Sequence, residues 1–132
     1  MRRRLGVLAL AGFALLAGGA CRTARYFPPV EAPAAGTLVE GMASWYGPRY
    51  HGRPTASGEI FDQNALTAAH PYWQFGTRVR VTLLSNGRSV VVQVNDRFGG
   101  HKGRIIDISK AAAERIGLIG PGVGRVRLEI IR

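Results

Sequence analysis

"RVRVTLLSNGRSVVVQVNDRFGG", residues 78–100, contains two strand-like runs separated by a turn signal. The first run, residues 78–84, alternates polar and apolar side chains, and the second, residues 89–95, is rich in valine. Both patterns are typical of β-strands that bury one face. Asn86-Gly87 favours a two-residue type I′ turn, because both residues tolerate positive φ. The segment therefore predicts an antiparallel β-hairpin.

The second strand of this hairpin ends on an acid. Side-chain alternation places Asp96 on the same face as the buried valines of residues 90–94, whereas Asn95 and Arg97 lie on the opposite face. A carboxyl that ends an apolar row is partly desolvated, which favours its protonated form and suits a general acid. The alternative is structural: Asp96 pairs with Arg97 or Arg104, or caps the turn.

The rest of the folded segment predicts further short elements. "GRIID", residues 103–107, is typical of a strand, and "SKAAAERIGLIG" predicts a short helix with Ser109 as N-cap and Gly117 near its C-terminus. Residues 125–130 alternate charged and apolar side chains and predict a last strand. Several short strands with one small helix indicate a mainly β, closed barrel, because closure removes exposed sheet edges.

The N-terminal residues have the pattern of an export signal. "MRRRLGVLALAGFALLAGGAC" has three arginines, an apolar run and then small residues, which predicts a secretory leader over residues 1–20. The alternative is an uncleaved anchor, although the apolar run is short for a membrane span. Residues 21–40 are rich in proline and alanine and predict a flexible tether, so that the folded domain covers residues 41–131.

Cys21 is the only cysteine, so no internal disulfide can form. Its position at the end of the leader resembles a bacterial lipobox, with Gly18 where a leucine is typical. The resemblance implies an acylated cysteine, and Arg22 in place of aspartate implies the outer membrane, facing the periplasm. The alternative is ordinary cleavage after Ala20. If the lipobox is not used, the protein would be in the inner membrane or soluble in the periplasm.

The chain is strongly basic. Of its 18 lysines and arginines three precede Cys21, which leaves 15 against 8 acidic residues and a net charge of +7 for the exported part. Such a charge predicts an anionic partner. The arginines are spread along the chain, and an exported protein meets lipid headgroups and wall polymers, so nucleic acid is not an expected partner.

Residues 41–71 concentrate polar and aromatic side chains. Three aromatic residues lie near the start of this segment: Trp45, Tyr46 and Tyr50. They would stack on sugar rings if they are exposed in a groove, or fill the barrel core if they are not. Glu59 and His70 are candidate site residues, the alternatives being a solvated surface acid and a strand-end histidine with internal partners.

Metal and serine-nucleophile chemistry lack a motif. His51, His70 and His101 accompany acidic residues, but there is no HExxH and no cysteine pair, so neither a metal centre nor a cofactor is predicted. Ser57 stands in "TASGE" rather than in a G-x-S-x-G turn, which gives no support to a serine triad.

Three stretches together resemble a known family: "GMASWYGPRYHGRPTASGEIFDQNALTAAH", "FGTRVRVTLLSNGRSVVVQVNDR" and "GRIIDISKAAAERIG". They are similar to the rare lipoprotein A family across residues 41–131. The resemblance implies a six-stranded double-psi β-barrel with one or two short helices, similar to the first domain of plant expansins. It also implies a lytic transglycosylase that cleaves peptide-poor peptidoglycan strands to 1,6-anhydro ends.

The resemblance also implies where the site lies. The family's functional positions fall on Glu59 of "SGE", His70 of "TAAH" and Asp96 of "VNDR", and Asp107 of "GRIID" matches the acid that closes the expansin groove. Asn95 and Arg97, which flank Asp96, are expected to bind substrate. The chain departs from the family after "VNDR", where Phe98 begins a glycine-rich stretch in place of Gly-Pro.

A lytic transglycosylase uses the substrate's own 6-hydroxyl as nucleophile, so one well-placed acid can suffice. The sequence hypothesis makes Asp96 the general acid and then the base, with Asp107 favouring its protonated form by like-charge repulsion. Glu59 and His70 would hold the sugar or stabilise positive charge. The competing hypothesis is a monomeric wall-binding module in which aromatic rings stack on glycan without cleavage; no protein partner is predicted.

Overall fold

A computed structural model describes residues 30–100 and 103–131 of the 132-residue chain. The predicted leader, Cys21 and His101 lie outside the described residues. The described part contains six strands and one helix: β1 (Leu38–Tyr46), β2 (Thr67–Ala69), β3 (Arg78–Leu83), β4 (Ser89–Asp96), β5 (Arg104–Ser109), α1 (Lys110–Ile116) and β6 (Val123–Ile130).

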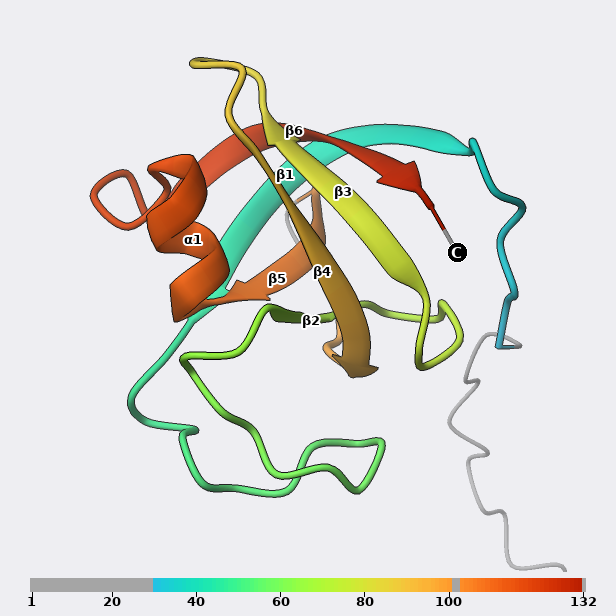
Figure 1. Ribbon diagram of the computed structural model, residues 1–132, viewed down its shortest axis with the longest axis vertical. Coiled ribbons are helices and arrows are strands. Elements are labelled where there is room, and N and C mark those ends of the chain that lie inside the picture. Colours follow the sequence, from blue (N-terminus) through green and yellow to red (C-terminus); the bar gives the residue numbers. More distant parts are fainter. Residues whose placement is uncertain (1–29, 101–102, 132) are drawn as a thin grey trace, which may run out of the picture.

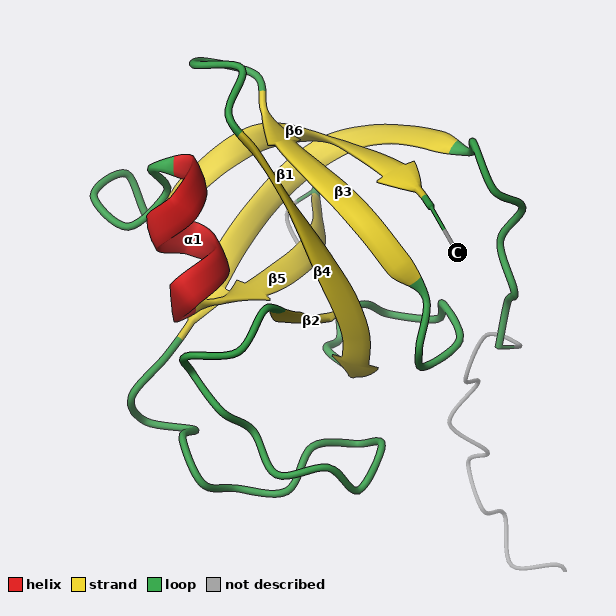
Figure 2. Cartoon of the chain, viewed as in Figure 1, coloured by secondary structure: helices red, strands yellow, loops and turns green. Residues whose placement is uncertain are grey.

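The strands form a closed barrel in the order β1-β5-β2-β4-β3-β6, with β6 returning to β1. The β1–β5 and β2–β4 pairs are parallel, and the remaining neighbours are antiparallel. Figure 1 shows α1 beside the barrel and the long loop of residues 47–66 beyond β2. Figure 2 shows that this loop carries no helix or strand. The predicted mainly β, six-stranded barrel is confirmed.

Alternate side chains of β3 and β6 fill the barrel interior, as the sequence predicted. In β3, Val79, Val81 and Leu83 are buried whereas Arg78 and Arg80 are exposed. The β6 strand repeats this pattern with its own buried residues at every second position from residue 126 to 130. Burial of such branched side chains contributes about 1.5–3 kcal/mol each relative to exposure, which makes this core the main source of stability.

The caps of α1 are those that the sequence predicted. Ser109 Oγ accepts from the N–H of Ala112 at 3.3 Å, and Gly117 closes the helix with φ of 78°. Its buried face holds Ala112, Ala113 and Ile116, which pack on the barrel. Within the described residues, no helix is both long and apolar enough to cross a membrane.

The β3–β4 hairpin pairs as predicted, but its turn is longer than the two-residue type I′ turn expected from Asn86-Gly87. The N–H of Leu83 donates to the carbonyl of Arg88 at 2.8 Å, which leaves residues 84–87 in the loop. Asn86 Nδ2 donates to the carbonyl of Ile116 at 2.9 Å. The Asn86 side chain thus satisfies a carbonyl at the end of α1, and this tertiary contact accompanies the longer loop.

A β-bulge in β4 breaks the predicted alternation. Ala68 of β2 pairs with Val94, but Ala69 pairs with Asp96, so Asn95 is an extra residue between the two pairs. Asn95 is only 3% exposed, although alternation placed it on the outer face, and Asp96 is half-buried. The acid therefore does not simply continue the buried valine row, because the bulge changes which way both side chains point.

The folded region begins before Gly41, the start expected from composition. The β1 strand starts at Leu38, and Glu31 forms two backbone hydrogen bonds, donating to the carbonyl of Tyr72 at 2.9 Å and accepting from Gln74 at 2.7 Å. Pairing with β6 and with this loop orders residues whose proline- and alanine-rich composition gave no strand pattern.

Candidate functional site

A cavity of about 180 Å³ lies where three strands end together. Tyr46, Ala69 and Asp96 are the last residues of β1, β2 and β4. We call this cavity the acid pocket, and its lining residues are Tyr46, Tyr50, Ala69, Asp96, Arg97, Phe98 and Asp107. The structure therefore brings together five of the side chains that the sequence proposed for a site.

The two acids of the pocket stand on either side of β2. Ala69 is the register partner of Asp96 in β4 and also of Asp107 in β5. Two strand spacings separate the acids, which corresponds to about 10 Å between their Cα atoms. Ala69 lies between them, and its small side chain leaves space in the pocket. The two carboxyl groups can therefore contact a ligand from opposite sides.

Asp96 is held by backbone donors. Its Oδ1 accepts from the N–H of Ala56 at 2.9 Å and from its own neighbour, the N–H of Arg97, at 2.8 Å. Such donors match an ionised carboxylate. The bond to Ala56 also ties the long loop of residues 47–66 to the end of β4, so the loop and the acid are positioned together.

Asp107, like Asp96, is half-buried. Burial raises the pKa of Asp107; a hydrogen bond from Ser44 Oγ at 3.0 Å and the charge of Arg104 oppose the rise, and the charge of Asp96 adds to it. Arg104 Nη1 in turn donates to Ser44 Oγ at 3.0 Å. Burial therefore favours the protonated form of Asp107, an acid to which alternation along β4 gave no such role. Two carboxyls in different environments are the arrangement that acid–base chemistry requires.

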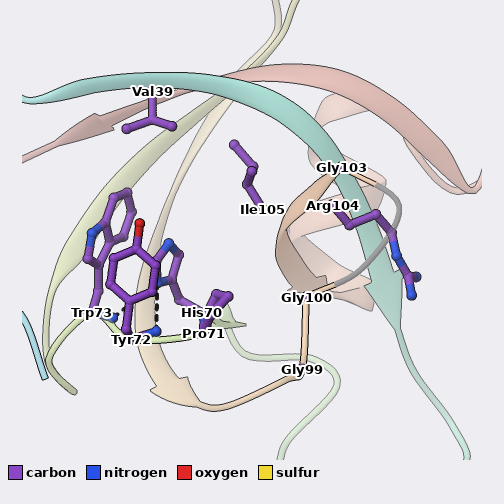
Figure 3. A pocket seen from close by; sticks show the side chains of 10 residues that line it. All are labelled: Val39, His70, Pro71, Tyr72, Trp73, Gly99, Gly100, Gly103, Arg104 and Ile105. Atoms are coloured by element: carbon purple, nitrogen blue, oxygen red, sulfur yellow. Dashed lines mark hydrogen bonds between the residues drawn. The ribbon is translucent and has the colours of Figure 1, made fainter. Parts of the chain in front are cut away.

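His70 is buried and neutral. Its Nδ1 accepts from the N–H groups of Tyr72 and Trp73 at 3.2 and 3.0 Å, bonds that Figure 3 shows as dashed lines. Burial, and then the charge of Arg97, lowers the pKa of His70 to about 3. The ring stacks on Trp73 with 3.8 Å between centroids. Because Nδ1 is an acceptor, the proton of the neutral ring is on Nε2, so His70 is a hydrogen-bond donor to any ligand and not a base.

His70 does not line the acid pocket. It lines a neighbouring cavity of about 350 Å³, drawn in Figure 3, with these other residues: Val39, Pro71, Tyr72, Trp73, Gly99, Gly100, Gly103, Arg104 and Ile105. His70 directly follows Ala69, so the two cavities flank the end of β2. The sequence motifs had grouped His70 with Asp96; the structure places them in adjacent cavities.

Glu59 is exposed on the long loop and does not line either cavity. Its Oε2 accepts from Asn95 Nδ2 at 3.3 Å, so the bulge residue links Glu59 to the end of β4. Trp45 also lies outside both linings and packs, half-buried, against the core. The side chain facing the pocket is its neighbour Tyr46, because successive residues of β1 point to opposite faces.

Several residues of the site carried no sequence signal. Ser44 contributes by donating a hydrogen bond to Asp107. Ala69 contributes by its position between the two acids of the pocket. A lone serine or alanine has no pattern that marks it for a site. Within residues 30–100 and 103–131, no group of three histidine, cysteine or acidic side chains could hold a metal ion.

Solved structures share this barrel. The Streptomyces papain inhibitor aligns with a TM-score of 0.63 and 23% identity over 77% of this chain and 100% of its own. An apo expansin of Clavibacter michiganensis aligns with a TM-score of 0.59 and 23% identity over 73% of this chain and 51% of its own. At these identities the likeness concerns the fold, a double-psi β-barrel.

Sequence relatives are more similar. The "Probable endolytic peptidoglycan transglycosylase RlpA" of Synechocystis sp. is 60% identical over 92 residues, which cover 70% of this chain and 29% of that protein. The "Endolytic peptidoglycan transglycosylase RlpA" of Campylobacter jejuni is 50% identical over 106 residues, covering 80% of this chain and 38% of that protein. The chain thus spans well under half the length of these curated relatives.

Residues 38–128 match the protein family described as "Lytic transglycolase". This match spans all six strands of the barrel except the last two residues of β6. Together with the identities to its relatives, it confirms the resemblance seen in the motifs, and it shows that the chain belongs to the lytic transglycolase family.

Proposed function

We propose that this domain is an endolytic lytic transglycosylase, which cleaves the MurNAc–GlcNAc strands of peptidoglycan to 1,6-anhydro-MurNAc ends. The observation that carries the proposal is the placement of Asp96 and Asp107 on strands that flank β2, across one open pocket. The names of the relatives support the same activity.

Aromatic side chains supply a binding surface for the sugar. Tyr50 is 43% exposed at the pocket, and its ring meets that of Tyr46 edge to face with 6.0 Å between centroids. Tyr46 in turn stacks on Phe61 at 4.4 Å, which fixes its orientation. Burial, with the charges of Asp96 and Asp107, raises the pKa of Tyr46, so its hydroxyl keeps its proton. Tyr50 would stack on a sugar face, and Tyr46, whose hydroxyl is buried, would hold the Tyr50 ring in place.

The proposed reaction needs one proton on the acid pair. Asp107, the desolvated carboxyl, donates its proton to the glycosidic oxygen as the bond from C1 of the sugar breaks. Ionised Asp96 stabilises the positive charge that develops at C1 and accepts the proton of the 6-hydroxyl, whose oxygen forms the new bond to C1. No water is consumed. These roles reverse the sequence hypothesis, because burial raises the pKa of Asp107 whereas the carboxylate of Asp96 accepts from two backbone N–H groups.

His70 and Glu59 have supporting roles in this proposal. His70 Nε2–H is a fixed donor beside the pocket, and Glu59, linked to Asn95, stands at the edge of the loop that holds Asp96. The Nε2–H would bind a sugar hydroxyl or acetamido oxygen rather than remove a proton.

The test is the chemistry of the product. The purified protein is incubated with peptidoglycan sacculi and with amidase-treated strands, and the soluble fragments are analysed by mass spectrometry. Muropeptides or glycans ending in 1,6-anhydro-MurNAc are the expected result. Reducing ends would instead show hydrolysis, and sedimentation with sacculi without any product would leave a wall-binding module.

We also propose that the protein is exported and anchored through an acylated Cys21 in the outer membrane. The support is the lipobox-like sequence before Cys21 and the basic character of the chain. Labelled palmitate is expected to enter the wild-type protein in cells and to be absent from a Cys21→Ala variant. Equal labelling of both proteins, or labelling of neither, would contradict the anchor.

A further inference from the structure

We propose that Arg97 forms a carboxylate-binding subsite at the edge of the acid pocket, so that the site selects a glycan with carboxylates over a neutral polysaccharide. The inference rests on the proposed function and deepens it by naming the group on the substrate that the pocket recognises. Three features of Arg97 carry it: a fixed guanidinium, an unused donor edge and the absence of an ion pair with a carboxylate of the described residues.

The guanidinium is held in place by contacts on one side. Its Cζ lies 4.0 Å from the centroid of the Phe75 ring, which is within the range of a cation–π interaction. Nη1 donates to the carbonyl of His70 at 3.3 Å and to that of Asp96 at 3.4 Å. A side chain fixed in this way loses little further entropy when it binds a ligand.

The opposite edge of the guanidinium is unused. Within residues 30–100 and 103–131, Nε and Nη2 of Arg97 have no hydrogen-bond partner. These two nitrogens form one of the edges through which a guanidinium donates two parallel N–H bonds to a carboxylate. The protein therefore occupies Nη1 and leaves Nε and Nη2 of this pocket-lining residue for a ligand.

Among the described residues Arg97 forms no ion pair with a carboxylate; burial lowers its pKa, while the charge of the neighbouring Asp96 acts on it without such a contact and raises the pKa. The Oδ1 of Asp96 is taken by two backbone N–H groups instead. Arginines on the outside of the barrel behave differently: Arg80, for example, bonds Glu129 at 2.8 Å. Among the described residues that line the acid pocket, Arg97 is the only cation, so its charge is available to a ligand.

The ligand chemistry that fits is a carboxylate on the glycan. Peptidoglycan offers two sources: the lactyl carboxylate of a MurNAc residue without a peptide, and the free carboxylates of a stem peptide. Chitin and cellulose offer neither. A charge-assisted pair of hydrogen bonds corresponds to about a tenfold or larger difference in affinity between matched charged and neutral ligands.

The experiment compares binding of four oligosaccharides of equal length to the whole protein by calorimetry. They are a peptide-free MurNAc–GlcNAc strand, the same strand with its lactyl groups converted to methylamides, a peptide-bearing strand and a chitin oligomer. The wild type is expected to bind a carboxylate-bearing strand at least about tenfold more tightly than the chitin oligomer. Preference for the peptide-free strand over its methylamide identifies the lactyl source, and preference for the peptide-bearing strand identifies the stem.

Two variants and one control locate the effect. Arg97→Gln is expected to bind all four ligands with similar affinity, and Phe75→Leu, which keeps the charge but removes the ring beneath it, to lose part of the preference. Arg115→Gln, at an exposed position of α1, removes the same charge away from the pocket and is expected to keep the wild-type preference. Thermal unfolding of each variant shows that it is folded.

Equal binding of charged and neutral strands by the wild type would overturn the subsite, as would a preference that survives in folded Arg97→Gln. The binding assay does not depend on turnover. A carboxylate preference without anhydro products would therefore remove the proposed activity and keep the subsite, whereas anhydro products without the preference would do the reverse.

Discussion

Asp96→Asn and Asp107→Asn are each expected to lower the rate of strand cleavage by about 10² to 10⁴, because each removes one partner of the proposed proton transfer. The two variants should differ when the leaving group changes. An aryl glycoside with a nitrophenolate leaving group needs no proton from the enzyme. Activity on such a substrate is therefore expected to recover in Asp107→Asn and to stay low in Asp96→Asn.

The substitutions are chosen so that the fold survives. An asparagine at position 96 still offers an oxygen to the N–H groups of Ala56 and Arg97. Asp62→Asn is the matched control, since Asp62 lies exposed on the same long loop and its Oδ1 accepts only from the N–H of Asn64, at 2.8 Å. Recovery in Asp96→Asn instead would return the acid role to Asp96, and unchanged rates in both variants would exclude the acid pair from the reaction.

Acidification from pH 7 to pH 5 is expected to lower the free energy of unfolding by about 2 kcal/mol more in the wild type than in a His70→Asn variant. The folded-state pKa of His70, about 3, lies below the ordinary value of 6.5. The unfolded chain therefore binds a proton that the folded chain does not. Stability falls as the pH drops through 6.5 by about 1.4 kcal/mol per unit, and the loss continues toward pH 3.

Urea unfolding at several pH values measures this difference. The asparagine oxygen can take the place of Nδ1 and accept from Tyr72 and Trp73, and the comparison cancels the carboxyl groups that both proteins share. If the free energies of unfolding of the wild type and His70→Asn change equally with pH, the pKa of His70 is the same in the folded and unfolded chain, which would contradict the prediction.

Much of the barrel follows from local patterns in the sequence. Alternation places Val79 and Val81 of β3 and Val126 of β6 inside, and Ser109 caps α1 as its position predicts. These features depend on side chains that lie close together in the chain. Family membership followed from longer motifs. These motifs contain residues whose contacts in the fold lie far along the chain, which alternation within one strand does not reveal.

The parts that local patterns missed depend on distant partners. The bulge at Asn95 exists because β4 pairs with β2, a strand of three residues with little pattern of its own. Which acid is desolvated is likewise decided by the strands around it: Asp107 is covered where β1 and β2 meet β5, and its partner Ser44 is 63 positions away in the sequence. No rule based on neighbouring residues contains that information.

The three-residue strand β2 gives the site a dependence on completed folding. It pairs with β4 on one side and β5 on the other, so the two acids face each other only after both pairings have formed. A chain in which only the β3–β4 hairpin has formed has Asp96 in place, but it lacks Asp107 beside it and therefore lacks the acid pocket. Non-local pairings of this kind are costly in entropy and form late relative to hairpins. For the proposed cleavage of glycan strands, a partly folded molecule would be inert, and activity would begin only when the barrel closes.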